Sequence, residues 1–263
     1  MLPTKRLSES PLAGAAVMNR LTVSVIMPVM DETVSLRETV QIVVEENSAD
    51  IHEIICVVSA FTTKEALGIC RELEVTHPGL VWTRQQRLPF LGGALQDAFA
   101  WSTGSHILLM ASDLETDPHT VMPLIAAARK GWDIVATTRW KVGGGFDGYN
   151  PVKYAANWLF QKVIGALYRT ELTDLTYGYR IWRTEVLRNH DWQEFRHPFL
   201  LECLLRPLLR GASATEIPVF WKGRKEGQSH NPFWRNFLYF RIALRLCFQH
   251  RNAPNPVIAE VSR

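Results

Sequence analysis

The chain has 263 residues, which is enough for one large α/β domain and too few for two of ordinary size. Hydrophobic residues make up 47% and charged residues 21%, a composition typical of globular proteins with a sizeable core. The formal net charge is only +3, and no long lysine or arginine block occurs, so the charge pattern argues against a nucleic-acid-binding protein.

The sequence carries no obvious targeting or membrane-spanning signal. No run reaches the roughly 18 apolar residues that a spanning helix needs. Residues 1–20 are expected to be a disordered leader, because Glu9 and several prolines and glycines interrupt any apolar stretch. The four cysteines form no CxxC pair, which favours reduced thiols. We therefore expect a cytoplasmic protein, which could also bind peripherally to the inner face of a membrane.

Strand patterns and helix patterns alternate between residues 21 and 138. The strand patterns are short buried runs at 23–28, 53–58, 80–84, 106–111 and 134–138. Capping boxes at Ser35–Glu38 and Thr62–Glu65 predict the starts of two helices, and Asp117 is expected to cap a helix whose first residue is Pro118. A further helix is predicted over 92–102. This alternation predicts an α/β fold with a mostly parallel sheet flanked by helices.

The alternation ends after residue 138. Residues 143–145 are all glycine and predict a flexible loop, helices are expected at 154–167 and 198–209, and a late strand is expected at 214–218. The stretch 234–248 is helical, apolar and rich in arginine. It either packs its aromatic face on the core or lies in a bilayer interface, with Arg235, Arg241 and Arg245 near lipid phosphates.

Ligands of such sheets bind outside the carboxyl ends of the strands, so the residues that follow each strand are candidates for the site. Neither GxGxxG nor GxxxxGK[ST] follows the first strand. Asp31 and Glu32 stand there instead, and their carboxylates would equally suit a helix start. After the fourth strand, Asp113 and Glu115 could reach one Mg²⁺ or Mn²⁺ that holds a diphosphate, although such an acidic turn is more often simply solvated.

Basic residues follow the later strands. Arg139 comes directly after the fifth strand, and the polar segments 174–180 and 224–230 contain further arginines. Arginine stays charged and binds phosphate bidentately, so several arginines beside one acidic turn suit a pair of phosphate-containing substrates. Each arginine taken alone is more commonly a surface residue or an ion-pair partner.

The order of these features resembles a known family. It runs Pro-x-x-x-Glu at 28–32, an acidic turn ending in Asp-Pro, Arg139 after a strand, Asp-x-Thr-x-Gly-x-Arg at 174–180, and Arg-x-x-Gly-x-Ser at 224–229. This set resembles the family 2 glycosyltransferases, and within them the dolichol- and polyprenyl-phosphate sugar synthases. The resemblance covers roughly residues 21–230, leaving 231–263 as a C-terminal amphipathic helix and tail. It implies a GT-A fold and a nucleotide-diphosphate sugar bound over the first half of the sheet.

The resemblance also implies roles for the donor-side residues. Pro28 and Glu32 match the motif beneath the nucleotide, and Ser59 and Arg84 complete this side of the expected binding site. Asp113 matches the last aspartate of a DxD-like motif. Glu115 falls at the position of a second metal ligand.

Further residues match the family on the acceptor side. Lys153 and Asn157 take the places of residues that meet the acceptor phosphate, and Glu202 falls where the family carries a glutamate in a late helix. Four more residues match the strand-end arginine and the two late motifs, namely Arg139, Arg180, Arg224 and Ser229.

The chain also departs from the family pattern. Residues 57–60 lack the usual Asp pair, Ala111 stands where the DxD-like motif begins, and His230 replaces a lysine. These departures motivate a second hypothesis, namely a catalytically degenerate protein of the same fold that binds sugar nucleotides or lipid phosphates.

The predicted reaction is an inverting, in-line transfer of a sugar from the nucleotide diphosphate to a polyprenyl phosphate or a glycan. The metal, with Arg139 or Arg224, would stabilise charge on the departing diphosphate. A phosphate acceptor is already ionised and needs no general base, whereas a hydroxyl acceptor would need one. Glu202 and Asp174 are the candidates, although Asp174 is expected slightly more strongly to orient Arg180.

Overall fold

The computed structural model describes residues 21–223 and 236–252, and the structural statements below concern this part of the chain. The expected leader at 1–20 lies outside the described residues. The same holds for Arg224, Ser229, His230 and Arg235.

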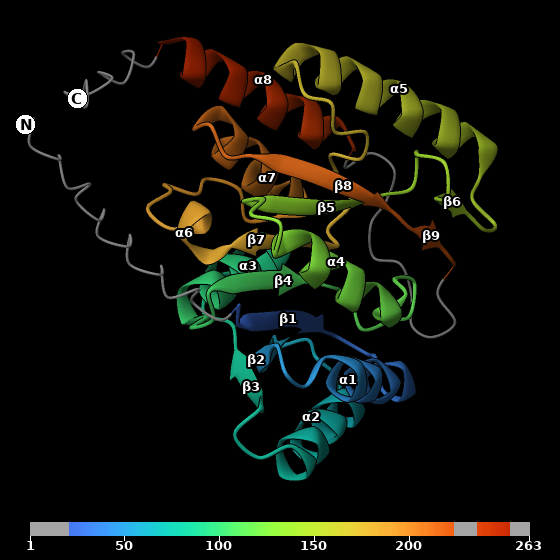
Figure 1. Ribbon diagram of the computed structural model, residues 1–263, viewed down its shortest axis with the longest axis vertical. Helices are drawn as coiled ribbons and strands as arrows, with labels where there is room; N and C mark the ends of the chain where they lie inside the picture. The colour runs from blue at the N-terminus through green and yellow to red at the C-terminus, as the bar shows by residue number, and fades with distance from the viewer. Residues whose placement is uncertain (1–20, 224–235, 253–263) are drawn as a thin grey trace, which may run out of the picture.

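A seven-stranded sheet with the order β3-β2-β1-β4-β7-β5-β8 forms the centre of the protein (Figure 1). Its strands are β1 (Val23–Val29), β2 (Ile51–Val58), β3 (Val81–Gln85), β4 (His106–Leu109), β5 (Ile134–Thr138), β7 (Arg180–Arg183) and β8 (Ala214–Pro218). Neighbouring strands pair in parallel except for β7, which is antiparallel to both β4 and β5. The prediction of a mostly parallel sheet is therefore confirmed.

Helices cover both faces of this sheet (Figure 1). One face carries α1 (Val34–Asn47), α2 (Lys64–Thr76) and α4 (Val121–Ala128), and the other carries α3 (Phe90–Trp101), α5 (Pro151–Tyr168), α7 (Phe199–Leu209) and α8 (Asn236–Asn252). Alternate strand residues supply the two cores: Val25 and Met27 face α1 and α2, while Ile26 faces α3 and α7. Because both faces are buried, the strands are almost continuously apolar.

Short elements complete the fold. The 3-10 helix η1 (Pro118–Thr120) precedes α4, and α6 (Thr184–Leu187) follows β7. A small parallel pair joins β6 (Gly145–Phe146) to β9 (Phe220–Trp221). Within the described ranges, no helix combines the length and the apolar character needed to cross a membrane.

The structure corrects several local predictions. The capping box at Ser35 is wrong, because α1 already begins at Val34, after Thr33. The cap of α2 is Thr63, whose side chain accepts from the Ala66 amide, and not Thr62. The hydroxyl of Thr62 instead donates to the Val29 carbonyl at 2.8 Å, which ties the turn after β2 to the end of β1.

The structure confirms one further local prediction and contradicts two others. Asp117 caps the helical turn at Pro118 as predicted, with its Oδ1 accepting from the His119 amide at 3.0 Å. The glycine loop at 143–145 was predicted to have no regular structure, but Gly145 begins β6. The stretch 174–180 was predicted to be a polar turn, yet Asp174 and Arg180 are fully buried and Arg180 begins β7.

Gly92 lets α3 approach the segment before α7 closely. A Cβ atom at Gly92 would lie 2.6 Å from the Phe195 carbonyl carbon and 2.7 Å from the Phe199 Cβ, whereas one at Gly68 in α2 would meet nothing within 4 Å. We expect Gly92→Ala to lower the free energy of unfolding by about 1–3 kcal/mol because of overpacking. Gly68→Ala should raise it by about 0.5–1 kcal/mol. Urea unfolding of both variants measures the difference, and equal midpoints would contradict the packing described.

Candidate functional site

Three separate stretches of chain meet at one edge of the sheet. β7 lies between β4 and β5 and runs opposite to both, so the residues before β7 reach the edge where β4 and β5 end. Adjacent strands are roughly 4.8 Å apart, which places the turns after β4 and β5 about 10 Å apart. The segment 174–179 lies between those turns. The topology thus brings Asp113, Arg139 and Asp174 into one region.

The acidic turn after β4 has a shape fixed by hydrogen bonds. Asp113 is buried, and its Oδ1 accepts from the Glu115 amide at 3.1 Å. Glu115 Oε2 accepts from the Trp221 indole Nε1 at 3.2 Å, and its carbonyl accepts from the Lys222 amide at 3.4 Å. Both carboxylates therefore come from one ordered turn, which the residues around β9 hold from the other side.

Arg139 and Asp174 form a buried, bidentate ion pair. Arg139 Nε and Nη2 donate to the two carboxylate oxygens at 2.7 and 3.0 Å, and the side chains are 9% and 0% exposed. The guanidinium also lies over the rings of Phe146 and Tyr177, at 5.0 and 4.3 Å from their centroids. Burial lowers the pKa of Arg139, but the charge of Asp174, its hydrogen bonds and the nearby Tyr177 and Tyr149 together raise this pKa above its ordinary value, so the guanidinium stays charged.

A second buried carboxylate, Glu216 on β8, holds the backbone at Asp174 in place. Glu216 Oε1 accepts from the Thr173 and Asp174 amides at 2.6 and 3.0 Å. Its other oxygen accepts from the Thr173 hydroxyl at 2.9 Å and lies 3.0 Å from Lys141 Nζ. The position of Asp174 is therefore set by its backbone as well as by Arg139.

The third support comes from α5. Gln161 Oε1 accepts from the Leu175 amide at 2.8 Å, and its Nε2 donates to the Thr176 hydroxyl at 2.9 Å and to Asn157 Oδ1 at 3.0 Å. This network joins Asn157 to the segment before β7. Lys153 lies one turn earlier on the same helix and is exposed. Of the two expected acceptor-phosphate residues, Asn157 is thus tied to the segment that carries Asp174.

Asp174 and Arg180 have other partners than the sequence analysis expected. Asp174 does not orient Arg180, because it pairs with Arg139. Arg180 is fully buried and donates to the carbonyls of Leu200 and Leu175, both at 2.7 Å. Burial lowers the pKa of Arg180. It clamps the segment before β7 to α7, which fits a positioning role better than direct contact with a ligand.

Glu202 is also committed inside the protein. Its side chain is fully buried; Oε1 accepts from Arg206 Nε at 2.7 Å and Oε2 accepts from the Glu194 amide at 2.8 Å. Arg245 of α8 lies 3.6 Å away. Both oxygens of Glu202 are therefore engaged inside the protein, which leaves this carboxylate poorly placed to meet a substrate hydroxyl.

The donor-side candidates occupy the turns after β1 and β2. Glu32 is buried and folds back to accept from the Met30 amide at 2.7 Å. Ser59 Oγ accepts from the Phe61 amide at 3.0 Å and lies 3.5 Å from the Met30 sulfur. Pro28 pairs in register with Val57. These turns are thus held together as one unit.

Arg84 lies near the donor-side candidates but far from the acidic turn, because it pairs in register with Val57, which in turn pairs with Pro28. It lies in the edge strand β3, separated from β4 by β2 and β1. Its guanidinium lies 5.8 Å from the ring centroid of Trp101 in α3. Since three strand spacings amount to roughly 14 Å, Arg84 is remote from the acidic turn.

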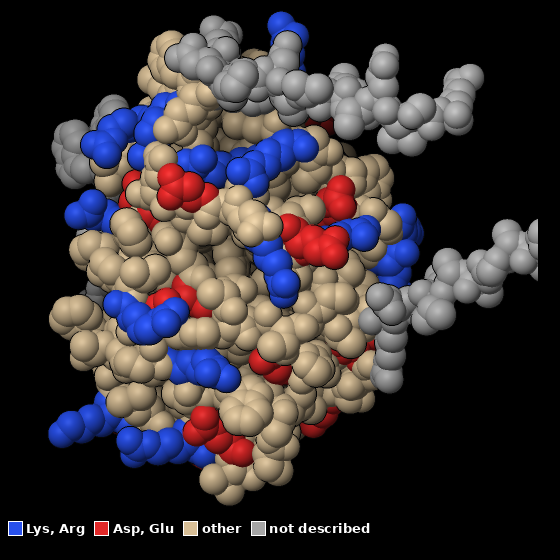
Figure 2. All heavy atoms as spheres, turned by 90° about the vertical axis from the view of Figure 1, so that its left-hand side faces the viewer, with Lys and Arg blue, Asp and Glu red and all other residues tan. Residues whose placement is uncertain are grey.

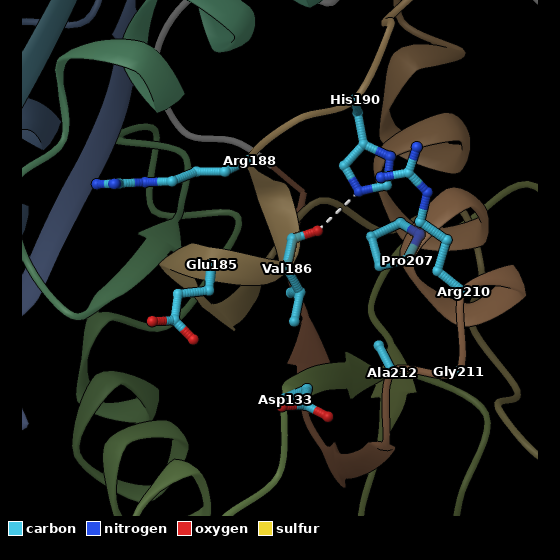
Figure 3. A pocket seen from close by; sticks show the side chains of 9 residues that line it. All are labelled: Asp133, Glu185, Val186, Arg188, His190, Pro207, Arg210, Gly211 and Ala212. Atoms are coloured by element: carbon cyan, nitrogen blue, oxygen red, sulfur yellow. Dashed lines mark hydrogen bonds between the residues drawn. The ribbon is translucent and has the colours of Figure 1, made fainter. Parts of the chain in front are cut away.

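A cavity of about 280 Å³ lies at the opposite, amino-terminal edge of the sheet, among residues that precede β5 and β8. Figure 2 faces this side, where basic and acidic side chains are interspersed. In Figure 3, His190 and Arg210 lie close together, and His190 Nε2 is bonded to the Val186 carbonyl, whereas Arg188 points away from them. None of the sequence-predicted residues lines this cavity, so it is not the candidate site.

Several residues at the candidate site were not predicted from the sequence. Trp221 and Glu216 sit in or after a late strand, and nothing in their local pattern points to the acidic turn. Tyr177 lies inside the motif 174–180 but was not singled out there. A glutamate inside a predicted strand, such as Glu216 in 214–218, is the sequence signal for this residue, because an acid that becomes buried needs partners.

Comparison with known proteins agrees with this arrangement. Residues 24–191 match the family model of "Glycosyl transferase family 2". The chain is 25% identical over 138 residues to a dolichyl-phosphate hexose transferase of Haloferax volcanii, covering 52% of this chain and 59% of that protein. It is 28% identical over 148 residues to an undecaprenyl-phosphate mannosyltransferase of Micrococcus luteus, covering 53% and 59%. The matches thus span less than two thirds of these curated relatives.

Solved structures share the fold. Glucosyl-3-phosphoglycerate synthase of Mycobacterium tuberculosis, crystallised with Mn²⁺, UDP and phosphoglyceric acid, superposes with a TM-score of 0.64 at 15% identity. The superposition covers 89% of this chain and 80% of that one. A structure of the same enzyme with Mn²⁺, UDP-glucose and phosphoglyceric acid gives a TM-score of 0.63, also at 15% identity, with coverage of 89% and 81%. The GT-A fold expected from the sequence is confirmed.

Removing one partner of the Arg139–Asp174 pair should be costly. Asp174→Asn leaves the Arg139 charge buried without its counter-ion, so we expect a loss of about 3–5 kcal/mol in the free energy of unfolding. The matched control is Glu72→Gln, which breaks the bidentate but exposed pair with Arg37 and should have little effect. Chemical denaturation measures both. A small loss in Asp174→Asn would mean that the pair contributes no more than a surface pair.

Proposed function

Because this chain belongs to glycosyl transferase family 2, we propose that it transfers a sugar from a nucleotide-diphosphate sugar to a polyprenyl phosphate, with inversion at the anomeric carbon. The observation that carries the proposal is the meeting of the acidic turn, the Arg139–Asp174 pair and α5 at one sheet edge. The names of the two curated relatives support a polyprenyl phosphate as acceptor and a hexose as the transferred sugar.

The donor would lie over the turns after β1, β2 and β4, with its diphosphate at Asp113 and Glu115. Mg²⁺ in nucleotide enzymes is commonly held by one or two carboxylates together with the substrate phosphates. The described residues contain no group of three or more His, Cys, Asp or Glu that could hold a metal alone. A pair of carboxylates from one turn therefore fits a cation that the diphosphate helps to bind. Such a cation would offset the charge that develops on the departing diphosphate.

The acceptor would approach from the side of α5. Lys153 is exposed, and Asn157 is fixed by Gln161, so a cationic and a polar group lie one helical turn apart. An aromatic group surrounds the start of this helix: the rings of Trp140 and Tyr154 are 4.9 Å apart, and those of Tyr149 and Trp221 are 5.5 Å apart. An amphipathic acceptor with a phosphate and an apolar chain suits this mixture.

The candidate bases favour a phosphate acceptor over a glycan hydroxyl. A hydroxyl must lose a proton as it attacks, so it needs a general base. Asp174 is committed to Arg139, and Glu202 to Arg206. Both carboxylates are fully buried and already bonded to an arginine, so neither is placed to meet an acceptor hydroxyl. A phosphate oxygen needs neither of them, because it is already ionised near neutral pH.

Membrane contact is part of this proposal, and α5 and α8 provide the surface. The two helices lie side by side at the top of Figure 1. The Phe160 and Phe240 rings, one from each helix, are 4.7 Å apart. Helix α8 buries one face on the core, as one of the two sequence interpretations expected. Its other side leaves apolar residues exposed, as does α5, namely Val152, Trp158, Leu159 and Val163 on α5 and Phe240, Leu244 and Phe248 on α8. Exposed lysines and arginines on both helices, Lys153, Lys162 and Arg241, suit an anionic lipid surface.

The metal and donor assignment predicts the behaviour of Asp113→Ala. Turnover of a panel of UDP- and GDP-sugars with Mn²⁺ and a polyprenyl phosphate should fall by roughly a hundredfold or more, because the diphosphate loses its main stabilisation. Glu185→Ala, at the opposite edge of the sheet, should leave turnover unchanged. Unchanged turnover in Asp113→Ala would contradict the assignment. Nucleotide binding without turnover by the unmodified chain would favour the catalytically degenerate alternative.

The membrane surface predicts that Leu159→Glu and Leu244→Glu weaken binding to vesicles of phosphatidylcholine and phosphatidylglycerol. Placing a carboxylate where a leucine would be buried should cost roughly tenfold or more in partitioning. Val75→Glu on α2 changes an apolar residue that is even more exposed but lies on the other face of the sheet, and it should have no effect. Vesicle flotation measures all three variants, and equal flotation would argue against this surface.

A further inference from the structure

The hydroxyl of Tyr177 is buried and has no hydrogen-bond partner in the part of the chain that the structure describes. Other buried tyrosines of the protein are satisfied. The Tyr179 hydroxyl donates to the Asp117 carbonyl at 3.1 Å, and the Tyr239 hydroxyl donates to the His197 carbonyl at 3.2 Å. Tyr177 therefore differs from Tyr179 and Tyr239 because its buried hydroxyl makes no hydrogen bond to the described residues.

An unpartnered buried hydroxyl is unfavourable, since it gives up its bonds to water and gains none. A phenylalanine at this position would keep the contact between the ring and the Arg139 guanidinium, which lies 4.3 Å from the ring centroid. The packing thus explains the ring of Tyr177 but not its oxygen. A partner from outside the chain would explain the oxygen.

The position of Tyr177 narrows the chemistry of that partner. The residue lies in the segment before β7, between the turns that follow β4 and β5. Burial raises the pKa of Tyr177 above its ordinary value; Arg139 lowers it, and Asp174, Glu115 and Asp113 raise it further. The hydroxyl consequently stays protonated and can donate a hydrogen bond throughout the neutral range.

An anionic ligand is the natural acceptor for this donor. Arg139 is already engaged by Asp174, so much of its charge is offset. Carboxylates of the acidic turn accept hydrogen bonds but donate none when ionised. A neutral donor beside them would complement a diphosphate that is bound with its cation.

We propose that the Tyr177 hydroxyl donates a hydrogen bond to the diphosphate of the nucleotide sugar. This inference rests on the function proposed above. In the reaction, the bond between the anomeric carbon and the diphosphate oxygen breaks as the acceptor phosphate oxygen bonds to that carbon. The hydroxyl keeps its proton and stabilises the charge that moves onto the diphosphate.

The test is Tyr177→Phe, with Tyr179→Phe as the matched control. Calorimetry with UDP, GDP and the corresponding nucleosides, in the presence of Mn²⁺, measures whether the hydroxyl contacts the phosphates. We expect Tyr177→Phe to weaken nucleoside diphosphate binding by on the order of tenfold to a hundredfold, the usual range for a hydrogen bond to a charged group. Nucleoside binding should not change. Turnover of the nucleotide sugar should fall as well.

Thermal unfolding gives an independent readout. Tyr177→Phe should unfold at an equal or higher temperature, because it removes an unsatisfied buried group. Tyr179→Phe should unfold at a lower temperature while keeping diphosphate affinity. Equal diphosphate affinity in Tyr177→Phe and the unmodified chain would overturn the inference, and so would a loss of stability in Tyr177→Phe equal to that of Tyr179→Phe. If no donor is turned over but the affinity difference persists, the proposed reaction fails while the Tyr177 contact stands.

Discussion

The bidentate pair between Arg139 and Asp174 holds the carboxyl edge of the sheet together. Each partner comes from a different segment, one after β5 and one before β7, and both are removed from water. Ionised groups are stable at such depth only when each has its counter-charge and hydrogen bonds. Glu216 and Gln161 complete these requirements through the backbone of residues 173–175. The segment before β7 is consequently fixed where the acidic turn can share a ligand with it.

The charged residues near this edge fall into two groups according to their position. Asp174, Arg180 and Glu202 are committed to partners inside the protein and shape the site without being available to a substrate. Asp113, Glu115 and Lys153 lie in the acidic turn or on the exposed side of α5. A transfer to an ionised phosphate needs charge stabilisation more than proton transfer. The engagement of Asp174 and Glu202 by arginines is consistent with this proposed reaction.

The exposed apolar surface of α5 and α8 is where the proposed reaction would meet a membrane. α5 contributes Asn157 to the polar network and Leu159 to the exposed apolar surface, so one helix links the site to the proposed membrane contact. A lipid-linked acceptor held at that surface would present its phosphate close to the sheet edge. The aromatic rings of Trp140 and Tyr154 lie together at the start of α5.

The sequence by itself determined the alternation of strands and helices up to Thr138, since local apolar runs and periodicity reflect burial directly. It also predicted that Asp113 and Arg139 lie at one edge of the sheet, because residues that follow parallel strands must meet there. Only the tertiary structure decided that Arg180 begins an antiparallel strand between β4 and β5, which inserts Asp174 and Tyr177 into that edge. Partner choice among distant charges, such as Asp174 with Arg139 and not Arg180, depends on through-space proximity, and no local pattern encodes it.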